Sequence, residues 1–111
     1  MNTLIYDKLL AVARSQSIIY YSEIAGLAGL DMSNPYDRNK IAELLGEISE
    51  HEHEQGRPML STVVVHKTED SPMPGKGFFT LAQSLGLHDG RDDRTFFGNE
   101  LQRVHDYWRE H

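Results

Sequence analysis

Residues 18–48 read IIYYSEIAGLAGLDMSNPYDRNKIAELLGEI, and they decide the predicted fold. Asn34 and Pro35 mark a helix start, because an Asn side chain accepts hydrogen bonds from the free N–H groups of a first turn and Pro suits the first helical position. Four apolar residues follow at helical spacing: Ile41, Leu44, Leu45 and Ile48. The pattern predicts a long helix that begins at Pro35 and ends before Gly56, with a solvated polar tail at residues 50–54.

A shorter helix and two strands complete the predicted motif around this helix. The β-branched and aromatic run at residues 18–21 is expected to be extended, and residues 23–28 to form the shorter helix. Residues 60–67 are rich in Val and Thr and predict a strand. After a loop of turn residues, residues 76–80 return as a second strand. Helix, linker, helix and hairpin follow in the order of a winged helix-turn-helix.

Helices at both ends are predicted to add to this motif. Residues 3–16 carry apolar side chains at helical spacing, residues 81–85 form a short helix, and residues 95–110 form the last helix. The last helix has an apolar stripe of four residues: Phe97, Leu101, Val104 and Trp108. This stripe either closes the core or pairs with a second copy of the chain in a homodimer. No repeat or linker divides the sequence, so we expect one α+β, winged helix-turn-helix-like domain over residues 1–111.

Length, charge and cysteine content limit the classes of function. The 111-residue chain has a net charge of −6 with His neutral, and it has no Cys, which excludes disulfides and thiolate chemistry. It lacks a signal-peptide pattern and an apolar run of about 18 residues, so we expect no membrane contact and a cytoplasmic location. The acidic balance weighs against nucleic-acid binding through the whole surface, but it allows a local basic patch.

A set of basic and polar residues would face DNA in such a fold. The second helix of the motif presents its first turns to the major groove, where Arg38 and Asn39 can read guanine and adenine. We expect these nucleic-acid contacts: Ser33, Asn34, Tyr36, Arg38, Asn39 and Lys40 from the helix, and Arg57, His66, Lys67 and Lys76 from the hairpin. The alternative is an ordinary solvated helix face. Five carboxylates further along the helix support this alternative: Glu43, Glu47, Glu50, Glu52 and Glu54.

Two groups of residues have the composition of other functional sites but the wrong spacing. His51 and His53 are two positions apart, so they point to different sides of a helix, and we expect no metal site. Ser61, His66 and Asp70 have the residue types of a hydrolytic triad. On a regular strand, however, Ser61 and His66 would face opposite ways, so we do not expect a catalytic site.

The glycine-bearing stretch at residues 74–77 suggests a phosphate-binding loop. It reads Pro-Gly-Lys-Gly, which lacks the spacing of a P-loop, and we expect a strand rather than a helix after it. We therefore interpret this stretch as a hairpin turn. With no catalytic constellation, the sequence predicts a non-catalytic binding module, not an enzyme, with no cofactor.

Two resemblances to known families accompany these patterns. The order of YSEIA (residues 21–25), an Arg38-bearing helix and a strand led by Pro58 resembles the winged-helix half of alkylguanine-DNA alkyltransferases and alkyltransferase-like proteins. That family has a Pro-Cys-His-Arg-Val strand where this chain has PMLSTV, so the resemblance implies the fold and not alkyl transfer. The phrases GRPMLS (residues 56–61) and PGKGFF (residues 74–79) are similar to those of small uncharacterised bacterial proteins, some carried on mobile cassettes such as integrons.

The sequence therefore favours a regulatory DNA-binding module, with a protein-interaction adaptor as the alternative. In the first interpretation the basic residues contact a duplex. In the second, the acidic helix and the hairpin bind another protein without nucleic acid. A contiguous positive face over Arg38, Lys40, Arg57, Lys67 and Lys76 would favour DNA, and an exposed acidic or apolar patch would favour protein.

Overall fold

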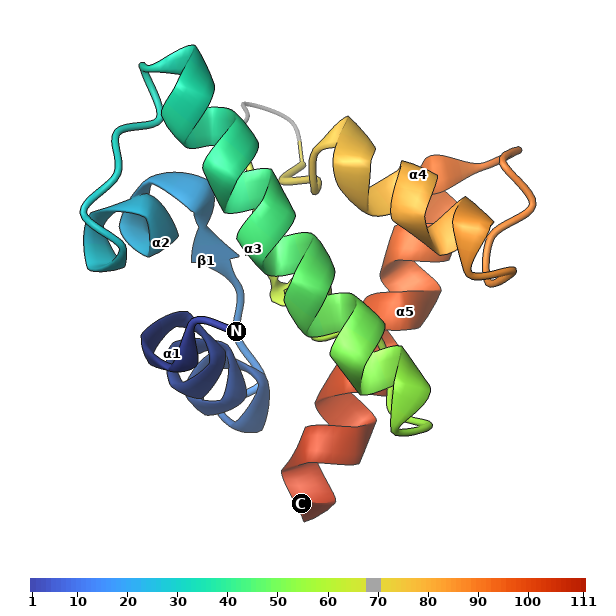
Figure 1. Ribbon diagram of the computed structural model, residues 1–111. Coiled ribbons are helices and arrows are strands. Elements are labelled where there is room, and N and C mark those ends of the chain that lie inside the picture. The colour runs from blue at the N-terminus through green and yellow to red at the C-terminus, as the bar shows by residue number, and fades with distance from the viewer. Residues whose placement is uncertain (68–70) are drawn as a thin grey trace.

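Helix α3 (Pro35–Glu54) runs obliquely across the molecule, and the other elements pack around it (Figure 1). The computed structural model describes residues 1–67 and 71–111. Its other elements are α1 (Thr3–Arg14), β1 (Ile19–Tyr20), α2 (Tyr21–Leu27), the 3-10 helix η1 (Leu60–Val63), β2 (Val64–Val65), α4 (Lys76–Ser84) and α5 (Asp93–Glu110). The chain is thus a compact α+β fold with a small two-stranded sheet. None of the described helices is both long and apolar enough to cross a membrane.

The predicted pair of middle helices is confirmed. Ile24 of α2 and Ile41 of α3 are fully buried in the same core. Helix α3 begins where its sequence indicates, because the Asn34 side chain accepts hydrogen bonds from the N–H groups of Tyr36 (2.9 Å) and Asp37 (3.4 Å). This half of the predicted motif therefore follows from a local cap and a local apolar stripe.

The predicted second strand is wrong, because residues 76–80 begin helix α4. Phe78, Phe79 and Ala82 are buried, and their i, i+1, i+4 spacing places them on one face of a helix. The aromatic pair that suggested a strand is therefore the start of a helical stripe. The predicted hairpin does not form, and a winged-helix topology is not confirmed.

The predicted first strand is shorter than expected and pairs with a different partner. Residues 60–63 form η1, and all four side chains are buried, so the alternation of a half-exposed strand is absent. Val64 and Val65 form β2, which pairs in parallel with Ile19 and Tyr20 of β1. The short extended run predicted before α2 is therefore a strand, and it is the partner of β2.

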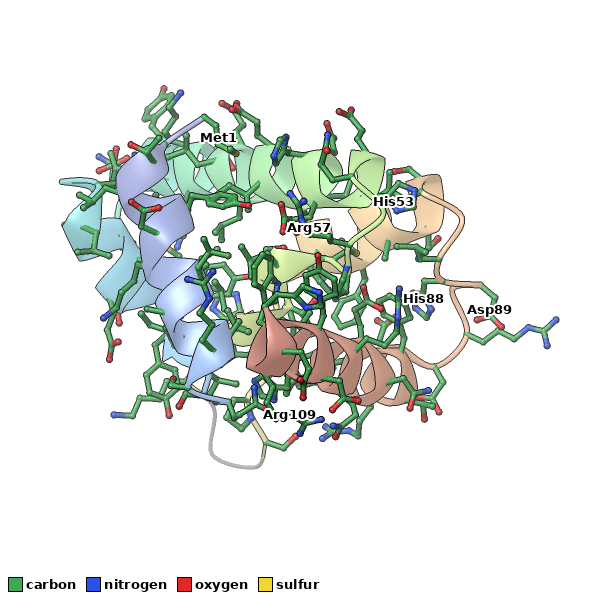
Figure 2. All side chains as sticks on the ribbon, turned by 90° about the horizontal axis from the view of Figure 1, so that it is seen from below. Met1, His53, Arg57, His88, Asp89 and Arg109 are labelled. Carbon is green, nitrogen blue, oxygen red and sulfur yellow. The ribbon has the colours of Figure 1, made fainter. Side chains whose placement is uncertain are left out.

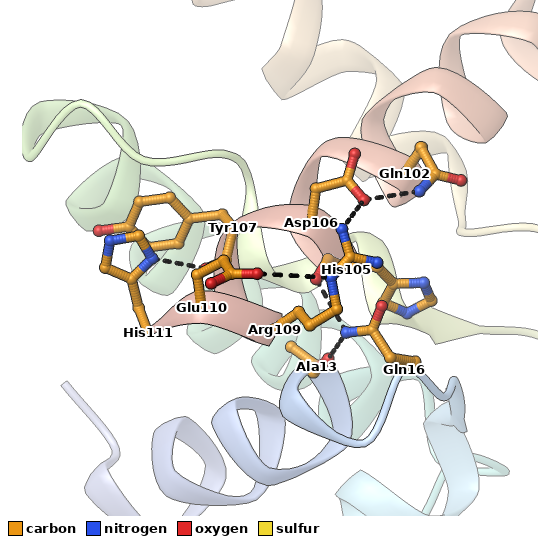
Figure 3. Close-up of polar contacts among 9 residues, drawn as sticks. All are labelled: Ala13, Gln16, Gln102, His105, Asp106, Tyr107, Arg109, Glu110 and His111. Carbon is orange, nitrogen blue, oxygen red and sulfur yellow. Dashed lines mark hydrogen bonds and ion pairs between the residues drawn. The ribbon is translucent and has the colours of Figure 1, made fainter.

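Helix α5 packs its apolar stripe into the core of the same chain. Val104 and Trp108 are buried, and α5 lies against α1 and η1. The end of α1 is tied to α5 by the Gln16 side-chain amide, which donates to the backbone oxygens of Ala13 (2.9 Å) and His105 (2.8 Å) (Figure 3). The buried part of the stripe thus closes the core and is not free to pair with a second copy of the chain.

The end of α3 is only in part the solvated tail that its composition predicts, because Glu50 and Glu54 are exposed but Glu52 is not. Glu52 is fully buried, and its carboxylate accepts hydrogen bonds from Arg57 Nε (3.0 Å), Arg57 Nη2 (2.7 Å) and the Tyr6 hydroxyl (2.9 Å). The Arg57 guanidinium also lies 6.0 Å from the centre of the Trp108 ring. Because a buried carboxylate is stable only when it is paired, these contacts are what allow Glu52 to enter the core.

Candidate binding site

A pocket of about 240 Å³ opens between α2, α3, η1 and the start of α4. Apolar side chains form much of its wall: Met32, Ala42, Leu45, Phe78 and Leu81. Polar and small residues complete it, among them Tyr21, Arg38, Ser61, His66, Gly75 and Lys76. Three of the predicted nucleic-acid contacts, Arg38, His66 and Lys76, therefore line one pocket although they are far apart in the sequence.

One wall of the pocket is a pair of stacked rings held against the start of α4. The ring centres of Tyr21 and His66 lie 4.2 Å apart, with the planes 25° from parallel. The Tyr21 hydroxyl accepts a hydrogen bond from the Gly75 N–H (2.9 Å). A Cβ at Gly75 would stand only 3.2 Å from His66 Nε2, so glycine permits this close approach. Burial lowers the pKa of His66 and raises the pKa of Tyr21, so both rings are uncharged at neutral pH.

The start of α4 gives the pocket a positive end. Arg38 and Lys76 line it, and neither side chain has a hydrogen-bond or ion-pair partner in the part of the chain that the structure describes. The first turn of α4 has no acidic residue, and its N-cap, Gly75, has no side chain to occupy the free N–H groups. Interpreting residues 74–77 as a hairpin turn is wrong, because a helix follows them directly. Free N–H groups and the helix dipole favour an anion at this end.

A pair of buried hydroxyls lies at the pocket wall. Ser61 is 6% exposed, and its Oγ lies 2.6 Å from Ser49 Oγ, which also accepts a hydrogen bond from the Ser61 N–H (3.0 Å). Ser61 and His66 line the same pocket because residues 60–63 are helical and not extended. Within the described residues no hydrogen bond joins Ser61 to His66. Asp70, the third residue of the triad considered from the sequence, lies outside the described residues.

The remaining residues predicted at the start of α3 lie on exposed surface, in the same first turns as Arg38. They are Ser33, Asn34, Tyr36, Asn39 and Lys40. Tyr36 is highly accessible, with 84% of its surface exposed. Lys40 has an exposed ion pair with Glu43 at 3.9 Å, which holds it only weakly. The Asn34 side chain is used to cap α3, so it is not available to contact a base.

The two remaining predicted phosphate contacts, Arg57 and Lys67, lie in different places relative to the end of the molecule where α3 and α4 begin. Lys67 follows β2 and is exposed, next to the isolated antiparallel bridge between His66 and Met73. Arg57 lies beyond the other end of α3, roughly 30 Å along the helix axis, and in the view from below it lies between α3 and α5 (Figure 2). The Arg57 guanidinium is bound to Glu52, and Arg57 does not line the pocket with Arg38 and Lys76.

The sequence did not point to Tyr21 as part of a binding site, and Ser61 was considered only as a member of a hydrolytic triad that a strand would not form. Tyr21 was expected only to end an extended run, and Ser61 to lie on a strand. Their partners in the structure, Gly75 and Ser49, are 54 and 12 positions away along the chain. Contacts over such separations leave no local pattern, so no sequence signal could have found them.

Comparisons with known proteins give no family assignment. No family model, curated protein or solved structure matches the chain. Among the described residues, no group of three or more His, Asp or Glu side chains is arranged to hold a metal ion. Function is therefore argued from the geometry and charge of the site.

Proposed function

We propose that the protein is a cytoplasmic, non-catalytic binding module that contacts double-stranded DNA with the end where α3 and α4 begin. The observation that carries this proposal is that Arg38 and Lys76, which have no partner within the described residues, line the same pocket. Tyr36, Asn39 and Lys40 add exposed groups at the start of α3. Cationic side chains bind the phosphates of DNA, and polar or basic side chains such as Asn39 and Arg38 read the edges of bases.

The distribution of charge along α3 supports an approach with its first turns only. Exposed carboxylates occupy the later turns: Glu43, Glu47, Glu50 and Glu54. They would repel a duplex laid along the whole helix. With only the first turns in the major groove, Arg38 and Asn39 would reach base edges and Lys76 a phosphate. In this mode α2 and α3 act as a helix-turn-helix.

Fluorescence anisotropy with a labelled duplex tests the proposal. Phosphate contacts from Lys40, Lys67 and Lys76 predict that log K falls against log salt with a slope of about −3. Lys76→Gln should weaken binding and reduce that slope by about one, and Arg38→Gln, at a base contact, should weaken binding and relax the sequence preference. Lys8→Gln, which removes the same charge from the exposed surface of α1, is the matched control. Absence of saturable binding at low salt, or an equal loss in the Lys8 variant, would contradict the proposal.

An exposed apolar patch favours a protein-interaction adaptor as the second candidate function. Met1 and Leu4 are 51% and 57% exposed, and the Met1 ammonium pairs with Glu47 of α3 at 2.9 Å. Apolar side chains thus lie beside the acidic face of α3, a combination that fits a basic amphipathic segment of another protein. Leu4→Asp should abolish binding of such a partner and leave duplex binding unchanged. Light scattering on the same sample tests the predicted homodimer.

A further inference from the structure

We propose that the pocket between α3 and α4 binds a small organic anion with a flat, largely apolar body, of the class of hydroxy-aromatic carboxylates. The carboxylate would lie near Arg38 and Lys76 at the start of α4, and the ring would pack against Leu45 and Phe78. This inference goes beyond DNA binding and does not depend on it.

The size of the pocket suits a ligand of this kind. A volume of about 240 Å³ is the space of roughly eight water molecules. Two small residues one turn apart on α3, Ala42 and Gly46, form part of the wall. A Cβ at Gly46 would meet Leu81 Cδ2 at 4.0 Å, so a larger side chain there would enter the pocket. The space is therefore kept open by small residues on a rigid helix.

The charge of the pocket selects an anion. No Asp or Glu is among the described residues that line it, whereas Arg38 and Lys76 are. Lys76 is the first residue of α4, where its positive charge is opposed by the positive end of the helix dipole. An anion bound there would offset both the Lys76 charge and the positive end of the helix dipole. Arg38 and Lys76 could bind it without breaking a contact with another described residue.

The pocket also offers two neutral polar groups for a ligand hydroxyl. Ser61 is more than nine-tenths buried, and its hydroxyl has one donor and two acceptor positions, of which the Ser49 hydroxyl uses one. His66, whose pKa is lowered by burial, presents a neutral imidazole that both donates and accepts. A hydroxyl on the ring of the ligand would use positions that the protein leaves unoccupied within the described residues, which favours a hydroxy-aromatic body over a purely apolar one.

Isothermal titration calorimetry with 4-hydroxybenzoate as the probe tests the inference. Three related molecules each lack one of its features: 4-hydroxybenzamide lacks the charge, benzoate the hydroxyl, and inorganic phosphate the ring. We expect 4-hydroxybenzoate to bind best, and Arg38→Gln to weaken it by about tenfold or more while leaving the weak binding of the amide unchanged. Ala42→Leu, a substitution at an exposed position that narrows the pocket, should abolish binding without loss of folding.

Lys40→Gln is the control, because Lys40 lies on the same helix but does not line the pocket. It should weaken duplex binding and leave 4-hydroxybenzoate binding unchanged. The inference is overturned if 4-hydroxybenzoate does not saturate the protein below about 10 mM, if the amide binds equally well, or if Ala42→Leu retains full affinity while its thermal unfolding shows a folded protein. A protein that binds 4-hydroxybenzoate but no duplex would uphold this inference and contradict the DNA proposal.

Discussion

At the scale of single residues, Arg57 illustrates how burial redirects a charged side chain. In the sequence it is a cation that could meet a phosphate, but in the structure it makes two hydrogen bonds to the fully buried Glu52. The hydrogen bonds to Glu52 raise the pKa of Arg57 further above its usual value, so the Arg57 guanidinium stays charged. Arg57 therefore contributes to stability, and its loss would leave a buried carboxylate without its main partner.

Replacing Arg57 by Ala should lower the free energy of unfolding by about 3 kcal/mol, because the Tyr6 hydroxyl and the more distant His51 ring (4.0 Å) do not replace the two hydrogen bonds from Arg57 to the buried Glu52. Urea unfolding followed by circular dichroism measures this loss. Lys40→Ala, which removes an exposed ion pair, should change stability by less than about 0.5 kcal/mol. If both variants unfold at the same urea concentration as the wild type, the Glu52–Arg57 pair is not structural.

His66 predicts how stability depends on pH. Burial lowers its pKa below the ordinary value of 6.5, so the folded state binds the proton less readily than the unfolded state. The stability associated with the neutral ring is present above about pH 6.5 and is lost as the pH falls towards the folded pKa. The melting temperature should therefore decrease from about pH 7.5 to pH 5.5, and His66→Gln should reduce that decrease. Identical pH profiles for the two proteins would refute this assignment.

At the scale of elements, local sequence signals predict where helices begin and which faces they bury. Contacts between distant segments decide the strand pairing and the helical state of α4. The cap at Asn34 lies within one turn of the groups that it satisfies, so it could be read from the sequence. The parallel pairing of Ile19 with Val64 joins distant segments and has no local pattern. Helix α4 was mistaken for a strand because Phe78 and Phe79 favour strands locally, and only their burial in the folded chain selects the helical period.

The cap of α3 is open to a direct test. Asn34→Ala should lower the free energy of unfolding by about 1 kcal/mol, because the N–H groups of Tyr36 and Asp37 lose their acceptor. Asn39→Ala, on the exposed surface of the same helix, is the matched control and should not destabilise the protein. Chemical unfolding of both variants measures the difference. Equal stability of the two variants would show that α3 does not depend on this cap.

At the scale of the whole molecule, the cations that line the pocket lie apart from the exposed carboxylates in the later turns of α3. The chain carries a net charge of −6, yet Arg38 and Lys76 line one pocket and the exposed carboxylates of α3 lie in its later turns. Both cations could be named from the sequence as candidate contacts. The pocket could not, because Leu45, Ser61 and Phe78 reach it from three separate segments.

The central claim is that ligands bind at the end of the molecule where α3 and α4 begin. The most direct measurement is a two-dimensional ¹H–¹⁵N NMR titration of the labelled protein with a DNA duplex. We expect the amide signals of Tyr36, Arg38, Lys40 and Lys76 to shift in a saturable way, while the signal of Arg57 stays in place. Shifts centred on Arg57 and α5, or no shift at any amide at low salt, would contradict the account.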